Sequence, residues 1–389
     1  MFKLISDATL GRRNLWLSGG VLAAGLTAVL GVSSRTATAP SNPSSLDLDT
    51  QLGEAAWPDE AAVAQRIAAT IQQSLADRYA DGGPTLRDVH SKSHGCVSAV
   101  FRVVDDLKPT LAVGAFVAGK SYPAWIRFSN GGSDATRPDI RGDGRGMAIK
   151  VMGVPGAKLI AAERDAETLD FVLINHPVFF ADDPARYERL IDRGSSKNPL
   201  VQVTAPLALG WRGMSIAREI ASSKIASTLE TRYWSSVPSR LGIGPNRLAV
   251  KYSARPCSPG TSVIPQDPAP DYLRAQMAEI LGERDACFDF LVQARSGSSM
   301  SVEDSRTEWQ EAEAPFVKVA TLTIPRQAFD TAERDAFCED LSFTPWHATE
   351  EHRPLGGVNR VRRVVYDTIS TYRHANNGTP RVEPSPPKL

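Results

Sequence analysis

The sequence predicts an α+β fold in which antiparallel strands close into a barrel and helices flank it. Two observations predict this fold: at least seven runs have strand patterns that look antiparallel, and a helix follows them near the C-terminus. The chain has 389 residues, which is enough for one large domain or two ordinary ones. No repeat of the length found in solenoids or propellers is visible.

The first half of the chain predicts one helix and four strands, followed by a helical region. Residues 59–79 have helical periodicity, and the later strands are more continuously apolar, as strands buried on both faces are. In the second strand, Arg127 and Ser129 share one face because side chains alternate along a strand. The expected strands are 97–104, 125–129, 147–152 and 169–174, and the helical region is 183–234.

The second half predicts three more strands, two helices between and after them, and the terminal helix. The expected strands are 246–253, 288–294 and 316–324, and the expected helices are 271–281 and 327–341. We expect this folded domain to cover 55–380, with a linker at 40–54 and a disordered tail at 381–389.

The first 39 residues have the composition of a signal peptide or an N-terminal membrane anchor. Lys3, Arg12 and Arg13 precede an uncharged run at 15–32, which is long enough to span a bilayer or to form a signal h-region. Positive charge before such a run places the remainder on the far side of the membrane. The sequence therefore predicts an exported or membrane-anchored, extracytoplasmic protein. Whether the segment is a cleaved signal peptide or an uncleaved anchor stays open.

Bulk composition excludes several classes of function. Lys+Arg and Asp+Glu number 44 each, so no net charge favours nucleic acid. The four cysteines lie far apart without C-x-x-C spacing, which argues against a zinc site and a dense disulfide scaffold. One bridge between Cys257 and Cys287 stays open. No P-loop, H-E-x-x-H or G-x-S-x-G motif occurs, and "GDGRGMA" predicts a turn that enters a strand.

A basic stretch near the C-terminus, "RVRRVVYDTIS", surrounds a single tyrosine. On a helix, Arg362, Tyr366 and Arg373 lie within about 40° of one another at ~100° per residue. Two cations flanking a phenol favour its ionised form, and a tyrosinate is an axial ligand of haem iron in catalases. The alternative is a surface helix with an arginine-rich face.

Further motifs, in order along the chain, distinguish these alternatives. They are "LRDVHSKSHG", "WIRFSNGG", "DFVLINHPVFF" and "PWHATEEHRPLGGVNRVRRVVYDTIS". Together they resemble the haem catalase superfamily from about Leu86 to Arg373, and are most similar to its short, catalase-related branch. The resemblance implies a catalase-like closed barrel, with the helix that carries the proximal iron ligand at the C-terminus.

The resemblance also implies how haem b, an iron porphyrin, would be held. Tyr366 matches the proximal iron ligand, and Arg362 matches the arginine that keeps that tyrosine ionised. Arg87, Arg127 and Arg373 match the arginines that bind the haem propionates.

On the distal side, where peroxide reacts, His90 matches the acid–base histidine and Ser129 the serine that orients it. Val172 and Phe179 match residues lining this apolar side, and Tyr187 stands where the family usually has a phenylalanine stacked on the haem.

Two features of the distal side leave alternatives open. The position of the family's distal asparagine falls on Ile174, and Asn175 is one place off, which on a strand means the opposite face unless a bulge intervenes. His94 could point the same way as His90 if the segment is extended, but only His90 has the Arg-x-x-His spacing from Arg87.

The resemblance implies a peroxide-metabolising enzyme of catalase or peroxidase type, acting on hydrogen peroxide or organic hydroperoxides in the oxidative-stress response. The alternatives are a lipid-hydroperoxide lyase or isomerase of the allene oxide synthase type, and a non-enzymatic haem-binding protein. We expect no nucleic-acid partner, and membrane association through residues 15–32. The sequence does not give an oligomeric state.

Overall fold

The computed structural model describes residues 48–388, in which one sheet closes into a barrel. The strand order is β5-β4-β3-β2-β1-β9-β8-β7-β6, all neighbouring pairs are antiparallel, and pairing of β5 with β7 closes the barrel. The strands are β1 (Ser93–Val103), β2 (Ser121–Asn130), β3 (Arg145–Met152), β4 (Thr168–Ile174), β5 (Tyr233–Trp234), β6 (Ser239–Leu241), β7 (Leu248–Pro256), β8 (Ala286–Ala294) and β9 (Val317–Ile324). The predicted closed antiparallel barrel with flanking helices is confirmed.

The inside of the barrel is a packed hydrophobic core and not a ligand cavity. Phe101, Phe171 and Phe290 meet there, with ring centroids 4.7–6.2 Å apart. Alternation along the strands sends their neighbours outward: on β2, Ile126 and Phe128 join this core, while the residues next to them face the helices. The outer face of β2–β4 is therefore free to build a site.

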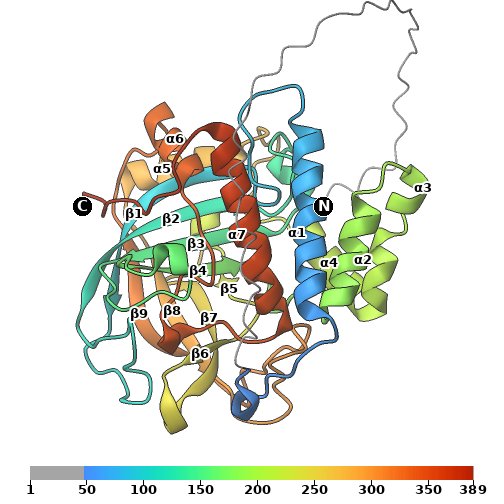
Figure 1. The fold of residues 1–389 in the computed structure, drawn as a ribbon. Helices are drawn as coiled ribbons and strands as arrows, with labels where there is room; N and C mark the ends of the chain where they lie inside the picture. Colours follow the sequence, from blue (N-terminus) through green and yellow to red (C-terminus); the bar gives the residue numbers. More distant parts are fainter. Residues whose placement is uncertain (1–47, 389) are drawn as a thin grey trace, which may run out of the picture.

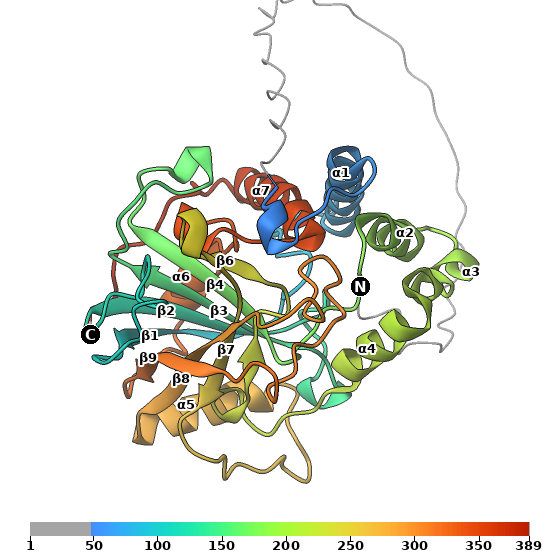
Figure 2. The same ribbon diagram turned by 90° about the horizontal axis from the view of Figure 1, so that it is seen from below.

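Helices cover that outer face. The long helices α1 (Glu60–Arg78) and α7 (Gly357–Asn377) lie side by side across the barrel, and α2 (Pro184–Gly194), α3 (Pro199–Gln202) and α4 (Gly210–Ser222) form a layer beside them (Figures 1 and 2). Ile67 and Ile71 of α1 pack with Val361 of α7 in a second buried cluster. Two further helices, α5 (Tyr272–Glu283) and α6 (Ala332–Asp340), lie near β1.

Two short strands were not predicted. The region expected to be helical over 183–234 ends in β5, and β6 follows it. Runs of two and three residues carry no detectable alternation, so only pairing defines these strands: β5 pairs with β4 and β7, and β6 pairs with β7. The missed β5 is the strand that completes the barrel.

The predicted linker and tail are wrong where the structure describes them, because both segments carry charges that the domain pairs. Near the N-terminus, Asp49 pairs with Arg247 at 2.5 Å, and Glu54 pairs with Arg360 at 2.7 Å. In the tail, Glu383 pairs with the buried Lys150 of β3 at 2.8 Å. The folded domain therefore includes residues 49–54 and the tail as far as 388.

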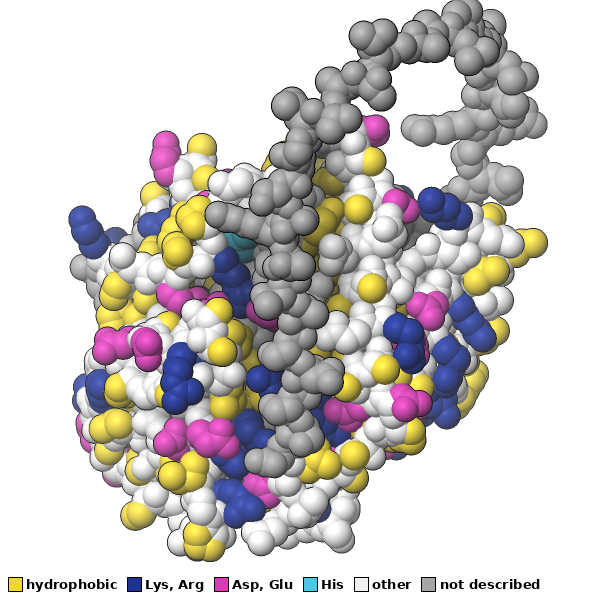
Figure 3. Space-filling model, viewed as in Figure 1, with side chains coloured by type: hydrophobic (Ala, Val, Ile, Leu, Met, Phe, Trp, Pro, Cys, Tyr) yellow, Lys and Arg dark blue, Asp and Glu magenta, His cyan; other side chains and the backbone are white. Residues whose placement is uncertain are grey.

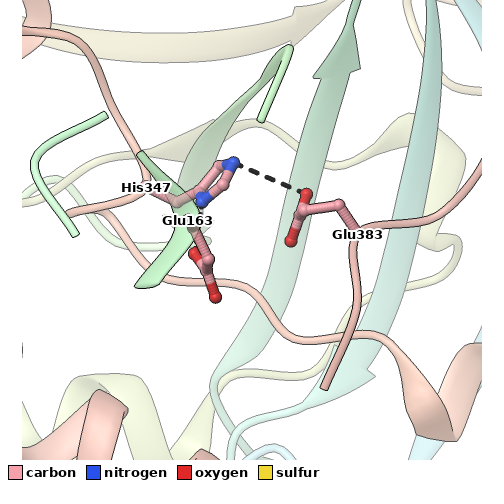
Figure 4. A group of neighbouring side chains, drawn as sticks. All are labelled: Glu163, His347 and Glu383. Atoms are coloured by element: carbon pink, nitrogen blue, oxygen red, sulfur yellow. Dashed lines mark hydrogen bonds and ion pairs between the residues drawn. The ribbon is translucent and has the colours of Figure 1, made fainter. Parts of the chain in front are cut away.

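The tail is fixed by a cluster of charged side chains from distant segments. His347 lies between Glu163 and Glu383, with 2.5 Å from its Nδ1 to Glu163 Oε2 and 3.5 Å from its Nε2 to Glu383 Oε2 (Figure 4). Lys150 and Arg381 neutralise the two carboxylates, the latter at 2.8 Å from Glu163. Through these ion pairs, Arg381 and Glu383 hold the tail against the domain.

Two disulfides link the chain. Cys257–Cys287 joins β8 to the segment that follows β7, and Cys96–Cys338 joins β1 to α6 across 242 residues of sequence. The first was an open alternative, whereas the second was missed because nothing in the sequence places α6 against β1. Among residues 48–388, no helix is both long and apolar enough to cross a membrane. The predicted anchor at 15–32 lies outside the described residues.

Candidate active site

One large cavity lies between the outer face of β2–β4 and the helices α1, α2 and α7. Its empty volume is about 1830 Å³, with the open solvent at its mouth included. All the site residues predicted from the sequence line it: Arg87, His90, Arg127, Ser129, Val172, Phe179, Tyr187, Arg362, Tyr366 and Arg373. Segments nearly 300 residues apart in sequence are thus brought to one site.

The side of the cavity formed by the barrel carries a histidine–serine pair. His90 lies just before β1, with a left-handed φ of 58°, and Ser129 lies on β2. His90 Nδ1 is 3.0 Å from Ser129 Oγ, which is hydrogen-bonding distance. Gly146 of β3 lies directly behind the pair: a Cβ there would be 2.5 Å from His90 Nδ1 and 2.8 Å from Ser129 Oγ. Only glycine leaves room for this pair.

The surroundings of His90 keep its ring neutral. Burial away from water, followed by the positive charges of Arg127, Arg362 and Arg87, lowers the pKa of His90 to about 3. Its ring is therefore an uncharged base across the neutral pH range. Arg127 also fixes the backbone here, because its Nη2 donates to the His90 carbonyl at 2.9 Å.

Three arginines gather at one end of the cavity around a single carboxylate. Arg87 pairs with Glu339 at 2.8 Å and Arg373 pairs with it at 3.5 Å. Arg87 and Arg373 also donate to backbone carbonyls of residues 338–341, next to the disulfide at Cys338. These arginines are therefore held by backbone as well as by charge.

The third arginine, Arg127, lacks a carboxylate partner. Within residues 48–388 it forms no ion pair, and its buried Nε has no hydrogen-bond acceptor. Burial, followed by Arg87, lowers the pKa of Arg127 well below its ordinary value, while burial and Arg87 lower that of Arg373 to about 10. Two buried cations and a partly buried one around a single carboxylate are unfavourable unless an anion joins them. This end of the cavity is suited to bind a ligand with one or two carboxylates.

The opposite wall is α7, which presents a phenol to the cavity. Arg362 Nη2 donates to Tyr366 Oη at 3.0 Å, and its guanidinium carbon lies 5.0 Å from the centre of that ring. The other arginines of the stretch have different tasks. Arg360 is buried among Glu54, Glu60 and Glu303, and Arg363 covers the ring of Trp346 at 5.1 Å. The basic cluster of the sequence is therefore neither a nucleic-acid patch nor a plain surface face.

The rest of the cavity wall is apolar. Val172 and Ile174 of β4 face it, and Phe179 and Tyr187 have ring centroids 6.0 Å apart. The open question about the distal asparagine has a clear answer, because no bulge intervenes in the pairing of β4 with β3. Asn175 points away from the cavity: its Oδ1 accepts from Arg145 N at 2.6 Å and its Nδ2 donates to Ser223 Oγ at 2.9 Å.

His94 also points away from the cavity. Its Nε2 lies 2.8 Å from Asn130 Oδ1, and the side chain is fully buried. The segment is not extended throughout, since His90 is left-handed and the register of β1 shifts between Ser93 and Gly95. The two histidine rings therefore lie in different environments, and only that of His90 lines the cavity.

Comparison with known proteins gives matches of one kind. A family model described as Catalase matches residues 84–220. A catalase-related peroxidase from Mycolicibacterium paratuberculosis is 26% identical over 290 residues, which is 71% of this chain and 85% of the relative. A catalase from Ascaris suum is 31% identical over 134 residues, which is 34% of this chain and 22% of the relative. The chain is therefore similar to members of the haem catalase superfamily.

Solved catalases share the fold of this chain. A fungal catalase aligns with a TM-score of 0.59 at 18% identity, and catalase A from Saccharomyces cerevisiae with 0.56 at 19%. Each alignment covers 76% of this chain but only 61% and 63% of those catalases, less than two thirds of their length. The family model spans His90 and Ser129 but stops before α7, so Tyr366 rests on the structure and on the sequence pattern.

Two residues of the cavity site were missed from the sequence. The close approach of Gly146 to His90 depends on how β3 lies beside β2, although "GDGRGMA" was recognised as entering a strand. Glu339 lies in α6 and meets Arg87 and Arg373 only in the folded chain. No local signal indicates such a counter-charge.

Gly146→Ala should disable the histidine–serine pair without removing a polar group. A methyl group within 3 Å of both partners must push them apart, so we expect hydroperoxide turnover to fall by about 10–100-fold, the effect of losing a supporting interaction. Steady-state turnover measures this, and Gly282→Ala on α5 is the matched control, because its new Cβ would meet nothing within 4 Å. Unchanged turnover in Gly146→Ala would show that the pair is not needed.

Proposed function

We propose that this chain is a haem-dependent peroxidase or catalase, with Tyr366 as the iron ligand and His90 as the distal acid–base residue. One observation carries the proposal. A single cavity has an arginine-paired phenol on the wall formed by α7 and a neutral histidine on the wall formed by the barrel. The catalase-related peroxidase and the catalases named above support the same class of reaction.

The residues present fit haem b in three respects. The Tyr366 oxygen, paired with Arg362, is an anionic ligand when ionised. Arg87, Arg127 and Arg373 supply cations for two propionates, and the orphaned Nε of Arg127 is a donor that such a carboxylate would satisfy. Val172, Phe179 and the neighbouring aromatic side chains supply apolar contact for the porphyrin faces.

Haem, when bound, supplies the two electrons that cleave the peroxide O–O bond. His90 handles the proton: with Nδ1–H donated to Ser129 Oγ, its Nε2 accepts the proton of ROOH and returns it to the leaving oxygen as water or alcohol. The low pKa of His90 keeps this nitrogen free of a proton beforehand. Peroxidase turnover then balances as ROOH plus two electrons and two protons giving ROH and H₂O, with a phenolic reductant as electron donor.

The distal wall favours organic hydroperoxides over hydrogen peroxide. Dismutation requires that a second H₂O₂ bind and be oxidised to O₂. No amide side chain of β4 is placed to hydrogen-bond it, because Ile174 faces the cavity and Asn175 points away. An apolar wall instead suits the alkyl part of a larger hydroperoxide. The same observation favours a second candidate, a lyase or isomerase for lipid hydroperoxides, which would consume its substrate without any reductant.

Ile174→Asn should raise O₂ release from H₂O₂ by about 2–10-fold, the worth of one added hydrogen bond of ~0.5–1.5 kcal/mol. The unmutated protein should release O₂ slowly and should oxidise a phenolic donor faster with an organic hydroperoxide. Oxygen-electrode and peroxidase assays measure the two activities, and Ile174→Val is the matched control that keeps the wall apolar. O₂ release by the unmutated protein at the rate of an efficient catalase would refute this substrate preference.

We also propose that the protein works outside the cytoplasm. The sequence begins with a basic segment, followed by an uncharged run and then a Pro/Ser-rich segment, which supports this proposal. The two disulfides also support it, because disulfides persist in oxidising compartments. Fractionation of cells that express the full-length chain tests it, and recovery of the protein in the cytosol would contradict it.

A further inference from the structure

The connection between α2 and α4 exposes large apolar side chains that no other segment within residues 48–388 covers. From 198 to 211 the chain carries no charged residue, and Lys197 and Arg212 flank this run. Leu200 is 76% exposed, Val203 66%, Leu207 61% and Trp211 85%. Scattered exposed apolar residues need no explanation, but several within one short connection mark an interaction site.

This connection forms an outer corner of the molecule. In both ribbon views α3 lies at the edge farthest from the barrel (Figures 1 and 2). The space-filling view has hydrophobic side chains at that corner and basic side chains below them along the same edge (Figure 3). Because α3 and the 3₁₀ helix at Ala205–Leu209 are short, 200–211 span only about 20 Å.

The charged residues within this stretch of sequence have one sign. Between 193 and 218 the sequence has Arg193, Lys197, Arg212 and Arg218 but no acidic residue. In the folded chain Lys197 lies 3.4 Å from Asp77 and Arg212 lies 3.9 Å from Asp304, but their side chains stay 90% and 57% exposed and can still reach an anionic partner. An apolar tip with a basic rim is therefore complementary to a surface that is apolar within and anionic outside.

We propose that this corner, residues 197–212, inserts into the surface of an anionic phospholipid bilayer and docks the domain on it. Leu200, Val203, Leu207 and Trp211 would enter the headgroup–acyl boundary, where indole rings are favoured, and the basic rim would contact lipid phosphates. A symmetric dimer through the same face fits less well, because an isologous contact would bring the basic rim against its own copy.

Docking there would place the membrane on the helical layer that borders the cavity. The layer that carries the corner lines the cavity on its inner side, through Tyr187 of α2 and Ile220 of α4. The 15 residues from 33 to 47 reach at most about 50 Å, so a chain held by residues 15–32 could lie on the same bilayer. Delivery of a lipid hydroperoxide from that bilayer rests on the proposed function, whereas docking itself does not.

Quenching of Trp211 by brominated lipid tests the docking directly. The full-length chain carrying Trp16→Phe is reconstituted in vesicles of brominated phosphatidylcholine, with or without phosphatidylserine. We expect quenching that depends on phosphatidylserine, is lost in Trp211→Phe and falls in Leu200→Ser/Leu207→Ser. Val263→Ser, equally exposed but distant in sequence, is the control and should change nothing.

Absence of Trp211-dependent quenching in phosphatidylserine vesicles would overturn the proposal. So would a detergent-solubilised dimer that Leu207→Asp converts to monomer, since the corner would then be covered by a second copy. Peroxidase activity is recorded for the same samples. Loss of quenching with activity intact refutes docking alone, while inactivity with quenching intact refutes the proposed function alone.

Discussion

His90→Ala is expected to lower hydroperoxide turnover by about 10²–10⁴-fold, the usual contribution of a positioned acid–base group. The ring is the neutral base on the barrel wall, and the substitution leaves the peroxide proton without an acceptor. Haem content should stay unchanged, because His90 lies on the wall opposite Tyr366 and its side chain bonds to Ser129 and not to Arg87, Arg127 or Arg373. Steady-state rates and the haem absorption of the same preparation measure the two effects.

The pH dependence of the unmutated protein supplies an independent check. Because the pKa of His90 is lowered to about 3, its base form persists as pH falls through 6.5. The base form is lost only as the pH approaches 3. The rate should therefore show no limb near pH 6.5. His94→Ala is the matched control, because His94 faces Asn130 and not the cavity. Full turnover in His90→Ala would contradict the assignment of His90 as the base. So would a fall in the rate of the unmutated protein near pH 6.5 that His90→Ala removes.

Tyr366→Phe should abolish stoichiometric haem binding, or leave haem bound without the absorption of a tyrosinate ligand. The phenol oxygen is the group on α7 that faces the cavity with an arginine at 3.0 Å, and phenylalanine keeps the ring while removing that oxygen. Haem content by pyridine haemochrome and the visible spectrum of the purified variant measure the effect.

Tyr187→Phe is the control for Tyr366→Phe. Tyr187 lines the same cavity, and a phenylalanine keeps its contact with Phe179. Haem binding should survive in this variant. If Tyr366→Phe retained both its haem and an unaltered spectrum, a different residue would be the iron ligand.

Local patterns predicted the parts of the site that depend on strand and helix geometry. The alternation that places Arg127 and Ser129 on one face of β2 follows from the pleat, and the spacing of Arg362 and Tyr366 follows from one turn of helix. The choice between Ile174 and Asn175 was out of reach, because it depends on whether β4 carries a bulge, and that is a property of its pairing with β3.

Features that depend on contacts between distant segments could not be predicted. Glu339 and Cys338 approach the arginine cluster only because α6 packs against β1, and β5 is a strand only because β4 and β7 lie on either side of it. The same holds for Asp49 and Glu383, whose partners lie about 200 residues away. Segments that look like a linker and a tail in composition are folded because they neutralise buried cations.

Rapid mixing of the purified ferric protein with an equimolar organic hydroperoxide tests the central claim, that this cavity holds haem and uses it on peroxides. The Soret band and the alcohol product are followed together. We expect a prompt change in the Soret band, formation of one alcohol per hydroperoxide, and return of the band when a phenolic donor is added. An unaltered Soret band with intact hydroperoxide would contradict the proposed function and would leave a haem-binding protein without turnover.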